Sequence, residues 1–137
     1  MSIKSMITKK LEEALQKSGN FDEEVVKSNA PLEFHDLINK YLADQGITKA
    51  DFIRMMSIDR NYGYLILSGQ RVPTRNCIIQ MGIMLRMNVD QLNYALLLVG
   101  KSPLYVRNLT DAKVFYAIEH NMDYYDAYDF IWGTAIV

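Results

Sequence analysis

The sequence predicts an all-α protein, and three observations support this expectation. Apolar residues recur at spacings of three and four along most of the 137 residues, as they do on one face of a helix. Only 7 Gly and 3 Pro interrupt the chain, and most of the glycines lie between these apolar stretches. No segment shows the alternation of apolar and polar residues that is typical of a half-buried strand.

The first 30 residues are expected to form an N-terminal helical arm. An amphipathic helix is predicted up to Gly19, and its apolar positions are Ile3, Ile7, Leu11 and Leu15. A short second helix is predicted after it, because Asn20 and Glu23 fit a capping box.

Three helices are expected between residues 31 and 69. Pro31 suits the first turn of a helix whose apolar stripe is Phe34, Leu37, Ile38, Tyr41 and Leu42, and this helix ends at Gly46. Thr48 caps a helix of about two turns, with Phe52, Ile53 and Met56 facing inward. Ser57-Ile58 breaks that helix, and Asp59 caps a new one that runs through Leu67 to a close at Gly69.

Four further helices complete the prediction. The helix after Pro73-Thr74 is apolar almost all round, which indicates a central, buried position. Asn88 and Gln91 form a capping box for the next helix, which runs through Leu98. Amphipathic helices follow at 110–120 and 123–132, and their expected inward residues are Val114, Phe115, Ile118, Ala127, Phe130 and Ile131.

Composition excludes several classes of protein. The length is that of one domain, and a hydrophobic share of 50% excludes a disordered chain. No run approaches the roughly 20 apolar residues of a membrane span, and residues 1–19 lack the core of a signal peptide, so we expect a cytoplasmic protein with no membrane partner. Cys77, His35 and His120 form no metal-binding or catalytic pattern. We therefore expect no metal, no cofactor and no enzymatic activity.

Residues 47–74 read ITKADFIRMMSIDRNYGYLILSGQRVPT. This stretch resembles the phage-repressor-like, or xenobiotic-response-element, family of bacterial and phage regulators. The family pattern has a hydroxyl cap, a first helix, a turn with a small and an aliphatic residue, and a polar second helix that ends in Gly-x-Arg-x-Pro-Ser/Thr. Here these features are Thr48, the helix to Met56, Ser57-Ile58, the opening at Asp59 and the stretch 69–74.

The resemblance implies a five-helix, lambda-repressor-like helix-turn-helix domain over residues 31–100. The sequences Tyr62-Gly63-Tyr64, Pro73-Thr74-Arg75 and LLLVGKSPLYVRNLTDAKVFYAIEHN are similar to a bacterial subgroup that carries an extra C-terminal helical pair. The resemblance therefore predicts three parts: an arm at 1–30, the helix-turn-helix domain at 31–100, and an extension at 101–137 packed on the same core.

The resemblance also implies a sequence-specific regulator of transcription that binds double-stranded DNA, expected as a homodimer. The helix from Arg60 to Leu67 would enter the major groove. Carried over to this chain, the groove-facing residues are Lys49, Arg60, Asn61, Tyr64 and Ser68, and those near phosphates are Arg71, Thr74 and Arg75. These residue types suit the task, because Asn pairs with adenine, Arg pairs with guanine, and cations and hydroxyls bind phosphate oxygens.

Charge is segregated in the direction that this function needs. Five basic and two acidic residues give residues 47–75 a net charge of +3, whereas three basic and five acidic residues give residues 101–137 a net charge of −2. Three departures from the family pattern stand against this agreement. Gly63 replaces a usual aliphatic residue, Leu65 and Leu67 replace positions that are often charged, and Ile53 replaces a usual small residue.

These departures and the aromatic C-terminus leave several alternatives open. Gly63 indicates either a close backbone approach or packing rearranged by Tyr62, which we expect to face inward. Leu65, if exposed, could touch a thymine methyl group or belong to a protein-facing patch. A protein-interaction module that uses Tyr64, Leu65, Leu67 or the aromatic C-terminus is thus the second functional hypothesis. Tyr124, Tyr125, Tyr128 and Trp132 fit either a dimer contact or a cap on the core.

Overall fold

The computed structural model describes residues 32–133 and, before them, only residues 9–10, 12–13, 16 and 19. The predicted capping box of the second arm helix lies outside the described residues, as does most of the first arm helix. The chain divides into two units, Met1–Leu32 and Glu33–Val137.

The all-α prediction is confirmed for residues 32–133, which contain seven helices and no strand. The helices are α3 (Phe34–Gln45), α4 (Lys49–Met56), α5 (Arg60–Leu67), α6 (Arg75–Met84), α7 (Val89–Leu98), α8 (Leu109–Glu119) and α9 (Tyr124–Trp132). None of these helices has the length and apolar character that crossing a membrane requires.

Most helices of this unit begin at a side-chain cap that the sequence already contains. Six of the seven start after a Thr, Asp or Asn whose side-chain oxygen accepts the backbone N–H three residues on; these are Thr48, Asp59, Thr74, Asn88, Asn108 and Asp123. The capping box predicted at Asn88 and Gln91 is present with both of its hydrogen bonds, each 2.8 Å long.

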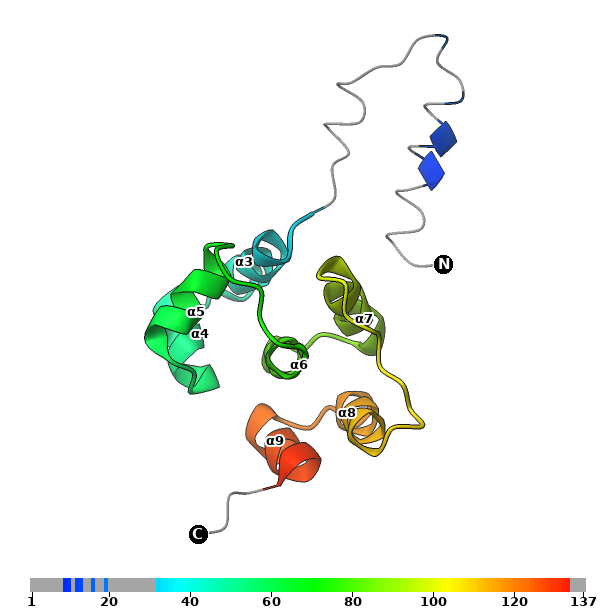
Figure 1. Ribbon diagram of the computed structural model, residues 1–137. Helices are drawn as coiled ribbons and strands as arrows, with labels where there is room; N and C mark the ends of the chain where they lie inside the picture. The colour runs from blue at the N-terminus through cyan, green and yellow to red at the C-terminus, as the bar shows by residue number, and fades with distance from the viewer. Residues whose placement is uncertain (1–8, 11, 14–15, 17–18, 20–31, 134–137) are drawn as a thin grey trace. The chain divides into compact units, whose positions relative to one another are not determined.

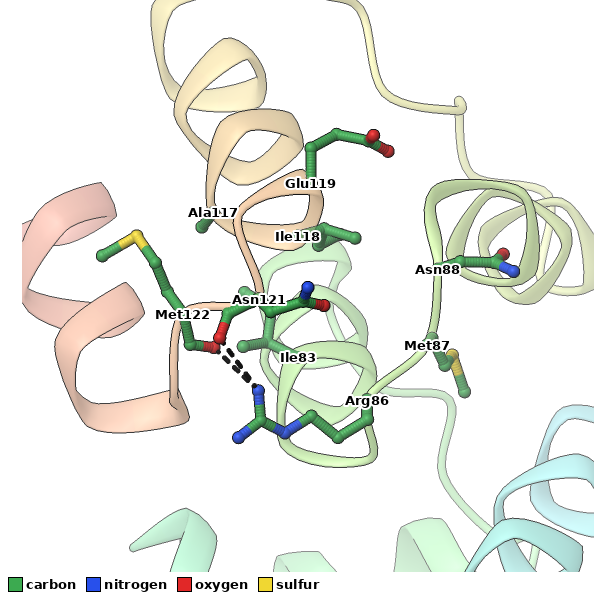
Figure 2. A pocket seen from close by; sticks show the side chains of 9 residues that line it. All are labelled: Ile83, Arg86, Met87, Asn88, Ala117, Ile118, Glu119, Asn121 and Met122. Carbon is green, nitrogen blue, oxygen red and sulfur yellow. Dashed lines mark hydrogen bonds between the residues drawn. The ribbon is translucent and has the colours of Figure 1, made fainter.

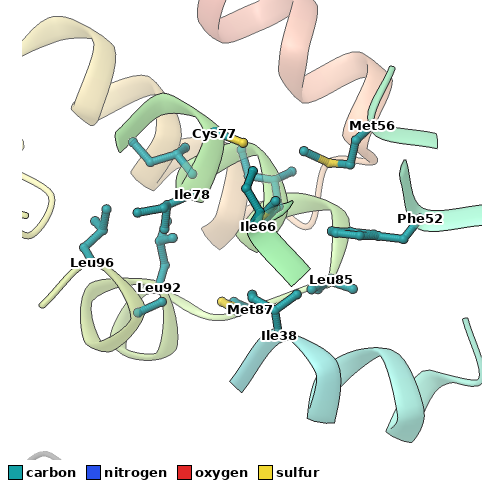
Figure 3. Packing of buried hydrophobic residues seen from close by; sticks show 14 of the residues in the cluster. Ile38, Phe52, Met56, Ile66, Cys77, Ile78, Leu85, Met87, Leu92 and Leu96 are labelled. Atoms are coloured by element: carbon teal, nitrogen blue, oxygen red, sulfur yellow. The ribbon is translucent and has the colours of Figure 1, made fainter. Parts of the chain in front are cut away.

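The core is centred on α6. This helix buries Cys77, Ile78, Ile79, Met81, Gly82 and Ile83, as its nearly uniform apolar pattern predicts. It packs against α4, α7 and α9, and Figure 1 shows it between the α3–α5 group and the C-terminal helices. Figure 3 shows Ile66 of α5, Phe52 of α4 and Leu92 of α7 converging on this cluster.

The C-terminal helices α8 and α9 share this core. They lie side by side, with α9 against α6 (Figure 1), and they bury Val114, Ala117, Ala127 and Ile131 in the same apolar cluster. Phe115 and Phe130 were expected to face inward, and this expectation is wrong, because each is more than a third exposed. The buried face of α8 passes through Val114 and Ala117, which turns Phe115 toward the rim.

Two basic residues at the ends of α6 hold α8. Arg75 at the start of α6 makes a two-pronged ion pair with Asp111 in the first turn of α8, with Nη1–Oδ1 at 2.9 Å and Nη2–Oδ2 at 2.8 Å. Arg86, just after α6, donates from Nη1 to the carbonyl oxygens of Met122 at 3.1 Å and Asn121 at 3.4 Å. The C-terminal pair is therefore tied to the central helix at both ends of α8.

Candidate functional site

The outward face of α5 is set by how this helix meets the core. Gly63, Ile66 and Leu67 are buried, and α5 contacts both α3 and α4. The Asn39 side chain of α3 donates from Nδ2 to the Leu67 carbonyl oxygen at 2.9 Å, which fixes the end of α5. With that side inward, the opposite side of the helix faces solvent.

The turn after α5 is held by close packing against α3. Gly69 has a φ of +82°, in the left-handed region that favours glycine. A Cβ atom placed there would lie 2.6 Å from Nδ1 of His35. Glycine is therefore required at this position both by its backbone angle and by the imidazole ring beneath it.

Four of the predicted site residues meet in one depression on this outward side. The depression has a volume of about 460 Å³ and is lined by Lys49, Asn61, Tyr64, Leu65, Leu67, Ser68 and Gln70. Asn61, Tyr64, Leu65 and Ser68 are spaced as i, i+3, i+4 and i+7, so they form one stripe along α5. Lys49 reaches the same place from the first turn of α4.

Two arginines flank the stripe, and each lies over a tyrosine ring. The Arg60 guanidinium carbon is 5.8 Å from the Tyr64 ring centroid, and that of Arg71 is 5.9 Å from the Tyr62 centroid. Both arginines are exposed. At such distances the ring face attracts the cation and restricts where the guanidinium lies. Tyr62 is partly buried against the core, in agreement with the inward orientation expected for it.

Ser68 and Thr74 have hydroxyl groups that are already engaged. Ser68 donates from Oγ to the Leu65 carbonyl oxygen at 3.1 Å, and Thr74 accepts the Cys77 N–H at 3.2 Å as the cap of α6. Both residues remain exposed. The Thr74 hydroxyl can still donate its proton to an anion, whereas Ser68 is restricted to accepting.

Arg75 is placed differently from its predicted role near phosphates. Besides the ion pair with Asp111, it donates from Nε to the Ser102 carbonyl oxygen at 3.2 Å and from Nη2 to the Pro103 carbonyl oxygen at 3.1 Å. Its guanidinium therefore serves the chain's own packing. We remove Arg75 from the candidate site, because moving it to a phosphate would leave the Asp111 carboxylate without its cation.

The Asp111 carboxylate is the chief buried charge in the described part of the chain. It is 5% exposed, and it also accepts the Tyr105 N–H at 2.9 Å. Its hydrogen bonds with Arg75 lower the pKa of this carboxyl group, and although burial works in the opposite direction, the Tyr105 N–H lowers the pKa further.

The expectation that Leu67 could contact a protein partner is also wrong. Leu67 is only 2% exposed, so it cannot hold a protein partner from the surface of α5. Leu65 and Gln70, by contrast, line the depression, although the carried-over site did not include them. Leu65 could have been found from its position four residues after Asn61 on the same helical stripe.

A second depression, of about 250 Å³, lies beside the Arg86 contacts. Figure 2 shows Ile83, Met87, Ile118 and Met122 among its lining side chains, with the Arg86 guanidinium reaching the carbonyl groups of the turn after α8. Since Arg86 is engaged in capping that turn, its charge has a structural explanation. No function is assigned to this depression.

Two places in the described part of the chain hold residues that could in principle bind a metal or react as a thiol. Glu33, His35 and Asp36 have potential ligand atoms within 4.8 Å of one another. Nδ1 of His35 lies 3.2 Å from a Glu33 carboxylate oxygen and Nε2 lies 3.3 Å from one of Asp36, so this group consists of one imidazole between two neighbouring carboxylates. Cys77 is buried, and burial raises the pKa of its thiol to about 11, so this thiol is poorly suited to nucleophilic chemistry.

Comparison of the chain with protein-family models, curated proteins and solved structures finds no match.

Proposed function

We propose that this chain is a sequence-specific, double-stranded DNA-binding regulator of transcription. In this proposal α4 and α5 are the two helices of a helix-turn-helix within a lambda-repressor-like domain, and α5 enters the major groove. The observation that carries the proposal is the depression on α5, where Lys49, Asn61, Tyr64 and Ser68 meet. Such a stripe suits base reading, because a major groove admits one helix face.

The electrostatics of this surface favour a polyanionic partner. Lys49, Arg60 and Arg71 are exposed around the stripe, and no carboxylate lines the depression. Two acids are close in sequence: the Asp59 side chain caps α5 by accepting the Tyr62 N–H at 3.0 Å, and Asp51, two residues after Lys49, pairs with Arg54 at 2.7 Å. Phosphate oxygens are the natural partners of these cations.

A selection of bound sequences from a pool of random duplexes tests this proposal. We expect one sequence motif to be enriched and its affinity to fall steeply with salt, because bound phosphates release counterions. If two copies bind together, the motif should contain two half-sites about 34 Å apart, which corresponds to one turn of the duplex. A pool without enrichment, or binding that is insensitive to salt, would contradict the proposal.

Single substitutions then separate base reading from phosphate binding. Asn61→Ala should lose about 1–3 kcal/mol of discrimination at one base pair. Arg71→Ala, at an exposed cation outside the depression, should weaken all duplexes alike and reduce the salt slope by about 1. Arg107→Ala is the matched control, because Arg107 is an exposed cation on the loop before α8 and should leave DNA affinity unchanged.

The second candidate function is binding of a protein partner, favoured by the exposed aromatic residues of the C-terminal pair. Tyr116, Tyr125, Tyr128 and Phe130 are exposed, and aromatic side chains are enriched at protein interfaces. A pull-down that survives high salt and fails with Tyr125→Asp would support this function. If Leu65→Asp abolished the capture instead, the partner would lie on α5, and DNA binding would have to be reconsidered.

A further inference from the structure

The depression on α5 is lined by both apolar and polar residues. Tyr64 and Leu65 are its apolar members that reach the surface, Leu67 is buried, and the polar members are Lys49, Asn61, Ser68 and Gln70. Tyr64 is 36% exposed, and Leu65 is partly exposed. The site therefore combines a small apolar contact area with adjacent hydrogen-bonding groups.

The apolar part of the depression is rigidly placed. The Leu65 carbonyl oxygen accepts three donors: the Gln70 N–H at 2.9 Å, the Arg71 N–H at 3.1 Å and the Ser68 hydroxyl at 3.1 Å. These bonds hold the backbone from which the Leu65 side chain projects. Arg60 lies over the neighbouring Tyr64 ring. A preformed surface of this kind costs little ordering entropy when a ligand binds.

The polar group best suited to reading a base is Asn61. Asn61 is exposed in the first turn of α5 and lines the depression. An Asn amide can donate to adenine N7 and accept from adenine N6 at the same time. Leu65 stands four residues later, so its Cβ lies about 5–6 Å from that of Asn61.

Only one kind of base pair offers, in the major groove, both a hydrogen-bonding edge for the Asn61 amide and an apolar group for Leu65. An A·T pair presents the adenine N6 and N7 atoms and the C5-methyl group of thymine, whereas a G·C pair presents no methyl group. We infer that the depression reads an A·T base pair, with Asn61 on the adenine edge and the thymine methyl group packed on Leu65 beside Tyr64. This inference rests on the proposed function and names what its central site recognises.

The test uses duplexes of the enriched sequence in which each thymine in turn is replaced by deoxyuridine, which lacks only the methyl group. At one thymine we expect the wild-type chain to bind about fourfold more weakly, the loss that corresponds to one buried methyl group. The Leu65→Ala variant should bind the thymine and deoxyuridine duplexes equally. Leu109→Ala, a matched change at an exposed leucine of α8, should retain the fourfold difference.

The outcomes distinguish the inference from the proposed function. Failure to enrich any duplex would remove the proposed function itself. Specific binding without a methyl effect at any thymine would leave that function standing and overturn the inference. A methyl effect of equal size in wild type and Leu65→Ala would also overturn it, because the methyl group would then be read elsewhere. Circular dichroism of both leucine variants checks that the helices are intact.

Discussion

Replacing Arg75 with alanine should lower the free energy of unfolding by about 3 kcal/mol, the lower end of the range for breaking a buried ion pair. The low end applies because the Arg75 side chain is 29% exposed while that of Asp111 is 7% exposed. The loss arises mainly because the Asp111 carboxylate stays buried without its cation. Urea unfolding followed by circular dichroism measures the change.

The chain contains a matched control for this prediction. Arg54 pairs with Asp51 at 2.7 Å on the surface of α4, with the Arg54 side chain 77% exposed. Arg54→Ala should cost about 0.5 kcal/mol or less, because water screens exposed pairs. Equal losses for the two arginine variants would show that the Arg75 pair contributes no more than an exposed one, contrary to our expectation.

Lowering the pH should reduce the difference in the free energy of unfolding between wild type and Arg75→Ala. The folded state lowers the pKa of Asp111, so the stabilisation is present above the unfolded value of about 3.9 and is lost as pH falls from there through the folded pKa. In Arg75→Ala the part of this pKa lowering that comes from Arg75 is absent. The unfolding curves of wild type and Arg75→Ala should therefore differ at pH 7 and converge below pH 4. A difference in the free energy of unfolding that does not change with pH would contradict this cause.

The ion pair of Arg75 with Asp111 is a feature that could not be predicted from the sequence. Most helix starts were predictable, because a capping side chain acts on a backbone group only three residues away, as at Thr48 and Asn88. The partner of Arg75 lies 36 residues along the chain, and no local pattern marks it. Asp111 itself resembled an ordinary acidic residue in the first turn of a helix.

The candidate site shows a similar division. The stripe through Asn61, Tyr64 and Ser68 could be predicted from the family resemblance and helical spacing, because both fix which residues share a face. The difference between Leu65 and Leu67 could not be predicted, since it depends on how α5 is rolled against α3 and α4. The rotation of α5 about its own axis results from packing between helices. Because both residues are leucine, the hydrophobic pattern alone does not decide which of them is buried.

Gly63 and Ile53, two departures from the family pattern, prove to be neighbours. A Cβ atom on Gly63 would lie 2.7, 2.9 and 3.0 Å from three side-chain carbons of Ile53. Of the two interpretations of Gly63, the structure thus favours close approach. The large side chain of Ile53 on α4 thus fills the space that a side chain at Gly63 on α5 would occupy.

The contact between Gly63 and Ile53 predicts that Gly63→Ala destabilises the wild-type chain but stabilises a chain that lacks the Ile53 side chain. In wild type, Gly63→Ala should destabilise the fold by about 1–2 kcal/mol, because overpacking outweighs the gain of about 1 kcal/mol in helix propensity. Ile53 is 4% exposed and has little room to move. Ile53→Ala alone should cost about 3 kcal/mol, since it leaves a cavity. In that variant the clash is gone, so adding Gly63→Ala should stabilise by about 1 kcal/mol.

Chemical denaturation of the four chains gives the coupling energy directly. Gly82→Ala is the control, because the nearest atoms to its added Cβ belong to Leu92 and Met87, and its effect should be alike in wild type and in the Ile53→Ala background. A cost of Gly63→Ala that stays the same in both backgrounds would mean that Ile53 does not require the glycine. A reversal of sign would mean that the packing of α4 on α5 depends on this pair, and with it the direction in which Asn61 and Leu65 face.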